Sequence, residues 1–204
     1  FKATSPIDID LTTTLQGTAD FADGVVGKAL KLDGKSYAEV ASDSASFALN
    51  LSNFTVAAWI YPEVIKGRWG ILSKRTGHAP SPFVLGLRDG CLVYEAMDEA
   101  GQWTSYNFAS PPVLKAGEWQ HVAAVVEEGK SVVLYVNGEP VATRELQGQK
   151  LATNEQALRI GWEAWGGDPP DAAVPGYFTG LIDEVKIWAR PLSAEEVAKE
   201  ARRP

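Results

Sequence analysis

Aromatic rings beside loops are the residues of this sequence best suited to surface chemistry. Seven Trp, seven Phe and six Tyr supply both a core and some aromatic surface. Rings that flank loops, or lie among Gly, Pro and charged residues, are Trp69, Trp103, Trp162, Trp165, Tyr94, Tyr106 and Tyr177. Because a sugar ring has an apolar C–H face and many hydroxyls, an exposed aromatic ring with a few polar neighbours predicts a saccharide-binding surface. The alternative for each ring is burial against a neighbouring loop.

Charged side chains could fix the orientation of such a ligand through strong hydrogen bonds. The candidates are Lys74, Arg75, Arg88, Glu95 and Glu163. Basic groups near the rings would favour an acidic sugar. The alternative for each charged residue is an ordinary solvated position on the surface.

A catalytic arrangement is not evident. Glycoside hydrolysis needs two carboxylates roughly 5 to 9.5 Å apart across the substrate. Glu95 and Asp98 form the nearest acidic group, but their spacing puts them on opposite faces of a continuing strand. His78 lies in an expected exposed loop and His121 on an expected strand, and neither has a recognisable nucleophile or base as a partner. We therefore expect no enzymatic activity.

The composition argues against several classes of protein. The formal net charge is −7, whereas nucleic-acid binding depends on Lys and Arg side chains that neutralise phosphates. No apolar run reaches the roughly 20 residues that cross a bilayer, so membrane insertion is not expected. The first residues, FKATSPIDIDL, lack the apolar core of a signal peptide. Cys91 is the only cysteine, which excludes an internal disulfide and a cysteine metal cluster.

The elements that must position these residues are short strands. Apolar segments with a period of two recur between turn residues, as in a β-sandwich. The expected strands are 29–32, 37–40, 54–61, 70–74, 83–88, 91–95, 105–109, 121–127, 131–136, 139–145, 157–161 and 178–189. Asp89-Gly90 and Asn137-Gly138 predict tight hairpins, because Gly and Asn tolerate a positive φ.

One helix and one domain complete the expected organisation. Ser193 and Glu196 form a capping box that predicts a short helix over 194–201. No repeat, linker or low-complexity tract divides the chain, so a single domain over 1–204 is expected. The longest irregular stretch is 164–176, and long loops in compact domains are often functional.

Three segments resemble the laminin-G-like jelly-roll family of the concanavalin-A-like superfamily. They are GKALKLDGKSYAEV with FTVAAWIYPE, GEWQHVAAVVEEGKSVVLYVNGEPVAT, and FTGLIDEVKIWARPLSAEEV, which follow the family's order over nearly the whole chain. The resemblance implies an all-β fold, a two-sheet antiparallel jelly-roll sandwich with a short C-terminal helix. It also implies that Trp59, Trp119 and Trp188, which lie within these segments, are core residues. DLTTTLQG stands where the family has a longer polar loop.

This resemblance leaves several functions open, because the fold hosts lectins, adhesion modules, carbohydrate-binding modules and some enzymes. With the aromatic surplus, we expect an extracellular, non-catalytic carbohydrate-binding module that binds a polysaccharide or glycan within a larger secreted protein. The alternatives are a protein-interaction or adhesion module, and a polysaccharide lyase or glycoside hydrolase. The expected binding residues are Trp69, Lys74, Arg88, Tyr94, Trp103, Trp162, Glu163, Trp165 and Tyr177.

The superfamily often holds one structural Ca²⁺, which takes about six to eight oxygen ligands. The resemblance places the candidate carboxylates at Asp33 and Asp183, with Asp10 joining from the N-terminal segment. The alternative is that Asp33 stabilises a turn and Asp183 accepts a backbone hydrogen bond.

Overall fold

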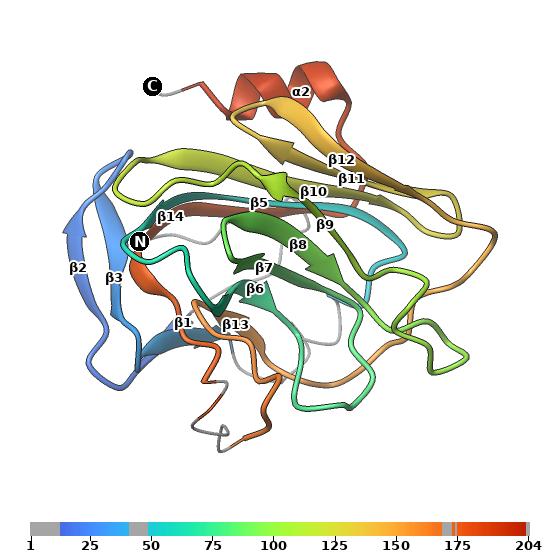
Figure 1. Ribbon diagram of the computed structural model, residues 1–204, viewed down its shortest axis with the longest axis horizontal. Helices are drawn as coiled ribbons and strands as arrows, with labels where there is room; N and C mark the ends of the chain where they lie inside the picture. The colour runs from blue at the N-terminus through green and yellow to red at the C-terminus, as the bar shows by residue number, and fades with distance from the viewer. Residues whose placement is uncertain (1–12, 41–48, 169–172, 174, 203–204) are drawn as a thin grey trace.

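Two antiparallel seven-stranded sheets pack face to face in the computed structural model, which describes residues 13–40, 49–168, 173 and 175–202 (Figure 1). The first sheet contains, in spatial order, β1 (Thr13–Gln16), β4 (Tyr37–Val40), β13 (Leu158–Ile160), β6 (Arg68–Ser73), β7 (Val84–Arg88), β8 (Cys91–Glu95) and β9 (Phe108–Pro112). The second sheet contains β12 (Glu139–Glu145), β11 (Ser131–Val136), β10 (Gln120–Glu127), β5 (Asn53–Pro62), β14 (Thr179–Trp188), β3 (Lys28–Asp33) and β2 (Asp20–Asp23). The sequence prediction of a two-sheet sandwich is confirmed.

Alternation along the strands builds the core between the sheets. On β5, Val56, Ala58 and Ile60 belong to the main hydrophobic cluster, and the residues between them face the opposite side of the second sheet. The same cluster takes side chains from the first sheet, including Leu85 and Leu87 of β7. Each sheet therefore has one face in the core and one outer face.

Both hairpins predicted from turn residues are present. Asp89 and Gly90 join β7 to β8 with φ angles of 50° and 81°. Asn137 and Gly138 join β11 to β12 with φ angles of 53° and 85°. Positive φ at both central residues matches the twist of the two strands, which is why these dipeptides select tight hairpins.

The helix α2 (Ala194–Glu200) lies against the outer face of the second sheet, at the top of Figure 1. Ser193 accepts a hydrogen bond from the Glu196 amide, and the Glu196 carboxylate accepts one from the Ser193 amide, so the predicted capping box is present. Val197 of the helix packs with Ala57 and Ala123 of the sheet in a second, smaller cluster. In the described part of the chain, no helix is long and apolar enough to span a membrane.

Three features near the sheet edges differ from the expectation. β1 and β2 were not predicted, because both are short strands without buried residues or an apolar period. The segment DLTTTLQG contains β1, which pairs with β4, so it is not simply a shortened loop. β9 covers 108–112 rather than 105–109, and its two prolines are tolerated because it is an edge strand.

Candidate functional site

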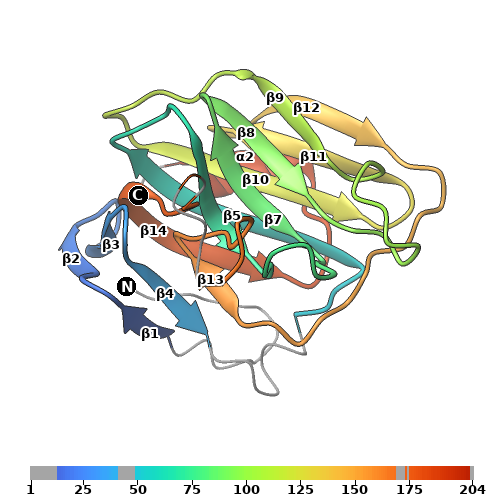
Figure 2. The same ribbon diagram turned by 60° about the horizontal axis from the view of Figure 1, so that its bottom comes forward.

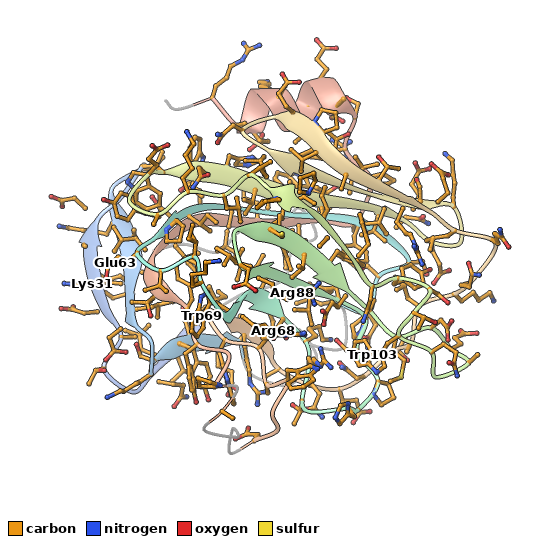
Figure 3. All side chains as sticks on the ribbon, in the orientation of Figure 1. Lys31, Glu63, Arg68, Trp69, Arg88 and Trp103 are labelled. Carbon is orange, nitrogen blue, oxygen red and sulfur yellow. The ribbon has the colours of Figure 1, made fainter. Side chains whose placement is uncertain are left out.

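The outer face of the first sheet carries a charged group over β6, β7 and β8. Leu92 and Tyr94 of β8 point into the core, so Glu95 faces outward, and by the same alternation Arg88 of β7 faces outward. Arg68 of β6 is the cross-strand partner of Arg88. Figure 2 turns this side of the sandwich toward the reader, and Figure 3 shows Arg68 and Arg88 close together on it.

Two buried carboxylates hold the centre of this group together. Arg68 donates hydrogen bonds to both Glu163 and Glu95. Arg75 donates to Glu95 at 2.8 Å and lies 3.9 Å from Glu163. Arg75, Glu95 and Glu163 are almost fully buried, and charges can be buried in this way only when they are paired and hydrogen-bonded. We call Arg68, Arg75, Arg88, Glu95 and Glu163 the arginine–glutamate cluster.

Burial changes the ionisation of this cluster. Desolvation raises the pKa of Glu163, although its hydrogen bond with Arg68 acts in the opposite direction. Desolvation also lowers the pKa of the Arg75 guanidinium, against the attraction of Glu163 and Glu95. Charge in this cluster is stable only while all partners are present.

Three arginine–tryptophan pairs lie at this side of the sandwich. The guanidinium of Arg75 is 4.1 Å from the ring centroid of Trp103. That of Arg68 is 5.1 Å from Trp165. Both Trp side chains are partly exposed, and attraction between a cation and the π face fixes each ring against a residue of the cluster.

The third pair belongs to a compact aromatic stack next to the cluster. Arg159 of β13 lies 4.4 Å from the ring of Trp162. Trp162 stacks on Tyr177 with centroids 5.0 Å apart and an interplanar angle of 11°. Tyr37 of β4 completes the stack at 4.7 Å from Trp162. Tyr37 and Tyr177 keep part of their surface exposed, whereas Trp162 is only 1% exposed.

Glycines let the segment that carries these rings lie directly on the sheet. A Cβ at Gly70 of β6 would overlap the backbone of Trp162 and Glu163, and a Cβ at Gly176 would overlap the carbonyl of Glu163. The Gly70 amide donates a hydrogen bond to the Gly176 carbonyl at 2.9 Å. Close backbone approach therefore sets the position of Glu163 and of the adjacent rings.

Four expected binding residues remain accessible on this side of the molecule. They are Arg88, Trp103, Trp165 and Tyr177. Figure 3 shows Trp103 on the same side of the molecule as Arg68 and Arg88. Sequence proximity gave no indication that these four residues, spread over about 90 positions, share one face.

Two expected binding residues are fully buried, and their assignment to a ligand surface is wrong. Tyr94 points into the core from β8, and its hydroxyl donates to the Pro82 carbonyl at 3.3 Å. Lys74 has no exposed surface; burial lowers its pKa to about 8, and it donates to Asn50 at 3.5 Å. Tyr106, another ring expected beside a loop, is also buried.

Three further expected residues contribute from below the surface. Trp69 lies on the inner side of β6 and packs against the core, so it is not an outer platform. Trp162 is buried in the aromatic stack and donates from Nε1 to the Pro175 carbonyl at 2.8 Å. Glu163 is enclosed by arginines. Trp162 and Glu163 therefore support the surface rather than form it.

The core assignment of the remaining tryptophans is correct only in part. Trp59 is buried, but Trp119 and Trp188 are half-buried. Alternation on β5 puts Trp59 on the outer face of the second sheet, and Trp119 contacts Tyr61 of the same face at 5.7 Å between ring centroids. These rings lie on the side of the sandwich opposite to the arginine–glutamate cluster.

Arg68 and Arg159 are site residues that sequence reasoning missed. Arg68 is adjacent to Trp69, and Arg159 lies between Leu158 and Ile160. These neighbouring side chains face the core. The period-two pattern assigns such a residue to the outer face, and this was the available signal.

Asp33 and Asp183, the described carboxylates considered for Ca²⁺, have separate sets of hydrogen-bond partners. Asp33 accepts hydrogen bonds from the hydroxyls of Thr18 and Ser36 and from the Lys35 amide, which lower its pKa to about 2. Asp183 accepts from the amides of Val26 and Glu184.

The strand register also shows that Asp33 and Asp183 are far apart. Thr179 is the register partner of Asp33, so Asp183 is four residues, or roughly 13 Å, further along β14. N–H and O–H groups donate hydrogen bonds to both carboxylates, and Asp10 lies outside the described residues. Within the ranges that the structure describes, no three His, Cys, Asp or Glu side chains gather in a metal-binding group.

Glu95 and Asp98, the acidic residues weighed for catalysis, have hydrogen-bond partners, and His78 and His121 pack against tryptophan rings. Asp98 accepts from the Gln102 amide and the Ser105 hydroxyl at 2.8 Å each. His121 is buried beside Trp59, with ring centroids 5.5 Å apart, and burial lowers its pKa to about 4. Glu95 and Glu163 are near one another, but the Arg68 guanidinium bonds both of them.

A pocket of about 150 Å³ lies elsewhere, at one end of the sandwich. Its lining includes Asn50, Glu99, Glu128, Lys150 and Leu151. This volume is below the roughly 300 Å³ of ordinary small-molecule sites, and the Glu128 carboxylate is already bound to the Leu151 amide. The outer face of the first sheet remains the stronger candidate.

The sequence and the fold both match known families. A family model for the concanavalin A-like lectin/glucanases superfamily matches residues 32–198, which confirms the resemblance of the three segments. A comparison with curated proteins gives no match.

Several solved structures share the fold at low sequence identity. Domain 4 of AbnA, a GH43 extracellular arabinanase from Geobacillus stearothermophilus, in complex with arabinotriose, has 20% identity and a TM-score of 0.69 over 93% of this chain and 88% of that chain. The CBM40 of the Ruminococcus gnavus IT-sialidase bound to alpha2,3 sialyllactose has 17% identity and a TM-score of 0.66 over 85% and 96%. The binding domain of Paraclostridial Mosquitocidal Protein 1 has 20% identity and a TM-score of 0.68 over 93% and 47%, so this chain spans about half the length of that binding domain.

Proposed function

The chain belongs to the concanavalin A-like lectin/glucanases superfamily, and we propose that it is a non-catalytic carbohydrate-binding module. In this proposal Trp103, Trp165 and Tyr177 stack against sugar rings, and polar groups between them bind hydroxyls. The module is extracellular and attaches the other domains of a larger secreted protein to a polysaccharide or glycan.

The observation that carries the proposal is the set of partly exposed rings fixed against arginines on one outer face. Arg75 holds Trp103 and Arg68 holds Trp165, while Trp162 supports Tyr177 from below. A ring that is already fixed loses little conformational freedom when a ligand stacks on it, which favours affinity. The similar structures with arabinotriose and sialyllactose support the proposal as members of the same fold.

The same face argues against hydrolysis. Glu95 and Glu163, which share Arg68, can be compared with a glycosidase pair, and burial raises the pKa of Glu163 as in a general acid. However, a glycosidic oxygen must lie between two catalytic carboxylates. In this protein the Arg68 guanidinium bonds both groups and takes that position.

A glycan array, followed by affinity electrophoresis in soluble polysaccharides, tests the proposal. We expect retention of the protein by at least one glycan class and no release of reducing ends or unsaturated products. Product release would support a hydrolase or lyase instead. Failure on every glycan, together with specific binding of a protein ligand, would support an adhesion module.

A further inference from the structure

We propose that this face is selective for acidic glycans, and that Arg88 binds the carboxylate or sulfate of the sugar. The inference rests on the proposed carbohydrate-binding function and specifies its ligand. It starts from the arginine–glutamate cluster, in which three guanidinium groups, of Arg68, Arg75 and Arg88, face two carboxylates. Among the residues that the structure describes, one positive charge in the cluster therefore lacks a compensating carboxylate.

The excess charge is located at Arg88. Arg68 and Arg75 are hydrogen-bonded to Glu95 or Glu163, whereas Arg88 approaches Glu95 only to 3.9 Å. The Arg88 side chain is 47% exposed, compared with 17% for Arg68 and 3% for Arg75. A ligand can therefore reach Arg88 without disturbing the buried pairs.

The register of the sheet adds a second reason. Arg68 and Arg88 are directly opposite each other on β6 and β7, and like charges in that position repel. Glu95 approaches both of them, and Glu163 adds a second carboxylate at Arg68. An anion bound at Arg88 would relieve this repulsion, whereas a neutral sugar hydroxyl would not.

The charge on this face is also directional. At its other end, Arg159 is paired with two carboxylates, Glu39 at 3.1 Å and Asp168 at 3.0 Å, so negative charge is in excess there. An acidic glycan is therefore attracted to the β7–β8 end and repelled from the β4–β13 end. This polarity orients the ligand across the face.

The chemistry of Arg88 suits an anion attached to a ring. A guanidinium presents two parallel N–H donors that match carboxylate or sulfate oxygens, and such charge-assisted bonds are about twice as strong as neutral ones. Trp103 and Trp165, each held by an arginine of the cluster, supply stacking surfaces for sugar rings at the same face. Together these groups would recognise an acidic sugar, because Arg88 binds its charged group and the tryptophans stack on its ring.

Paired polymers that differ only in charge test the inference. The wild-type protein is compared on polygalacturonate and its carboxyl-reduced form, on dextran sulfate and dextran, and on an array of neutral, uronate-bearing and sulfated glycans. We expect the charged member of at least one pair to bind about tenfold or more tightly, with the difference reduced at high salt. Preference within the first pair identifies a carboxylate, and preference within the second identifies a sulfate.

The variant Arg88→Gln is expected to remove most of the preference for the charged polymer. Arg88→Lys is expected to retain part of it, because Lys keeps the positive charge but lacks the two parallel N–H donors. Lys31→Gln is the matched control: Lys31 is an exposed cation on β3 of the second sheet, far from Arg88 in Figure 3. It makes the same change in net charge and should leave affinity within about twofold.

The outcomes separate this inference from the proposed function. Equal binding of charged and neutral glycans, or an unchanged preference in Arg88→Gln, overturns the role of Arg88 and leaves the carbohydrate-binding module intact. Equal losses in Arg88→Gln and Lys31→Gln show nonspecific attraction and also overturn it. Failure to bind any glycan on the array removes both.

Discussion

Trp103 and Trp165 can be tested without removing a core residue, because both rings are partly exposed. We expect Trp103→Ala and Trp165→Ala each to weaken polysaccharide binding about tenfold or more, since stacking area is lost while the sheet remains. Isothermal titration calorimetry on the glycan selected by the array gives the dissociation constants. Trp119→Ala on the opposite face is the control and should bind as wild type, whereas equal losses in all three variants would point away from this site.

We expect the buried His121 to make the protein less stable in mild acid. Burial lowers its pKa from 6.5 to about 4, so between these values the unfolded chain binds a proton that the folded protein does not. The free energy of unfolding is therefore unaffected above pH 6.5 and falls as the pH decreases toward 4, by about 2 kcal/mol between pH 7 and pH 5.

Urea unfolding of His121→Gln and of the control His78→Gln at both pH values measures this effect. His78 is exposed, so its variant should keep the full pH dependence of the wild type. His121→Gln should lose most of it. The same pH dependence in all three proteins would show that other groups cause it.

For single residues, the sequence indicates which side chains could bind a ligand better than it indicates which of them are exposed. Arg88, Trp103 and Trp165 were recognised by residue type and by neighbouring loop residues. Tyr94 is also aromatic, but it faces the core. The alternation along β8 indicates this, because the adjacent Glu95 faces outward. Partners such as Pro175 for Trp162 depend on contacts that no local pattern encodes.

The segment 162–165 carries much of the aromatic site, and its contact with β6 depends on Gly70. We expect Gly70→Ala to displace this segment, because the new methyl group would overlap the backbone at Glu163. The result should be lower stability, by about 1 to 3 kcal/mol, and weaker glycan binding. Urea unfolding and calorimetry on the same sample measure both quantities.

Gly101→Ala is the control that distinguishes displacement of the segment from backbone strain alone. Gly101 has a φ of 78°, but a Cβ there would meet nothing within 4 Å. The variant should therefore lose some stability and keep its affinity. If Gly70→Ala binds glycan as tightly as wild type, the close approach to β6 does not control the site.

Strands with a clear apolar period, and hairpins with Asp-Gly or Asn-Gly, were predictable element by element. Four predicted strands, 37–40, 91–95, 131–136 and 139–145, have the bounds found in the structure. β1 and β2 were not predictable, since these edge strands owe their conformation to pairing with β4 and β3 rather than to their own residues. The position of 162–165 on β6 is likewise a long-range contact.

The whole molecule places different side chains on its two outer faces. The second sheet carries α2 and the half-buried Trp119 and Trp188, while the first carries the arginine–glutamate cluster with Trp103 and Trp165. The chain has a net charge of −7, so the proposed binding of an acidic glycan would depend on local positive charge near Arg88 rather than on the overall field. Family resemblance predicted the sandwich, but the charges on each face follow from strand order.

The indole N–H signals of the seven Trp residues in a ¹H–¹⁵N NMR spectrum test the central claim most directly. Titration with the selected glycan should shift the signals of Trp103 and Trp165, assigned by single Trp→Phe variants, and leave those of Trp59, Trp119 and Trp188 in place. Binding that shifts Trp119 or Trp188 while Trp103 and Trp165 stay unchanged would contradict a carbohydrate site on the outer face of the first sheet.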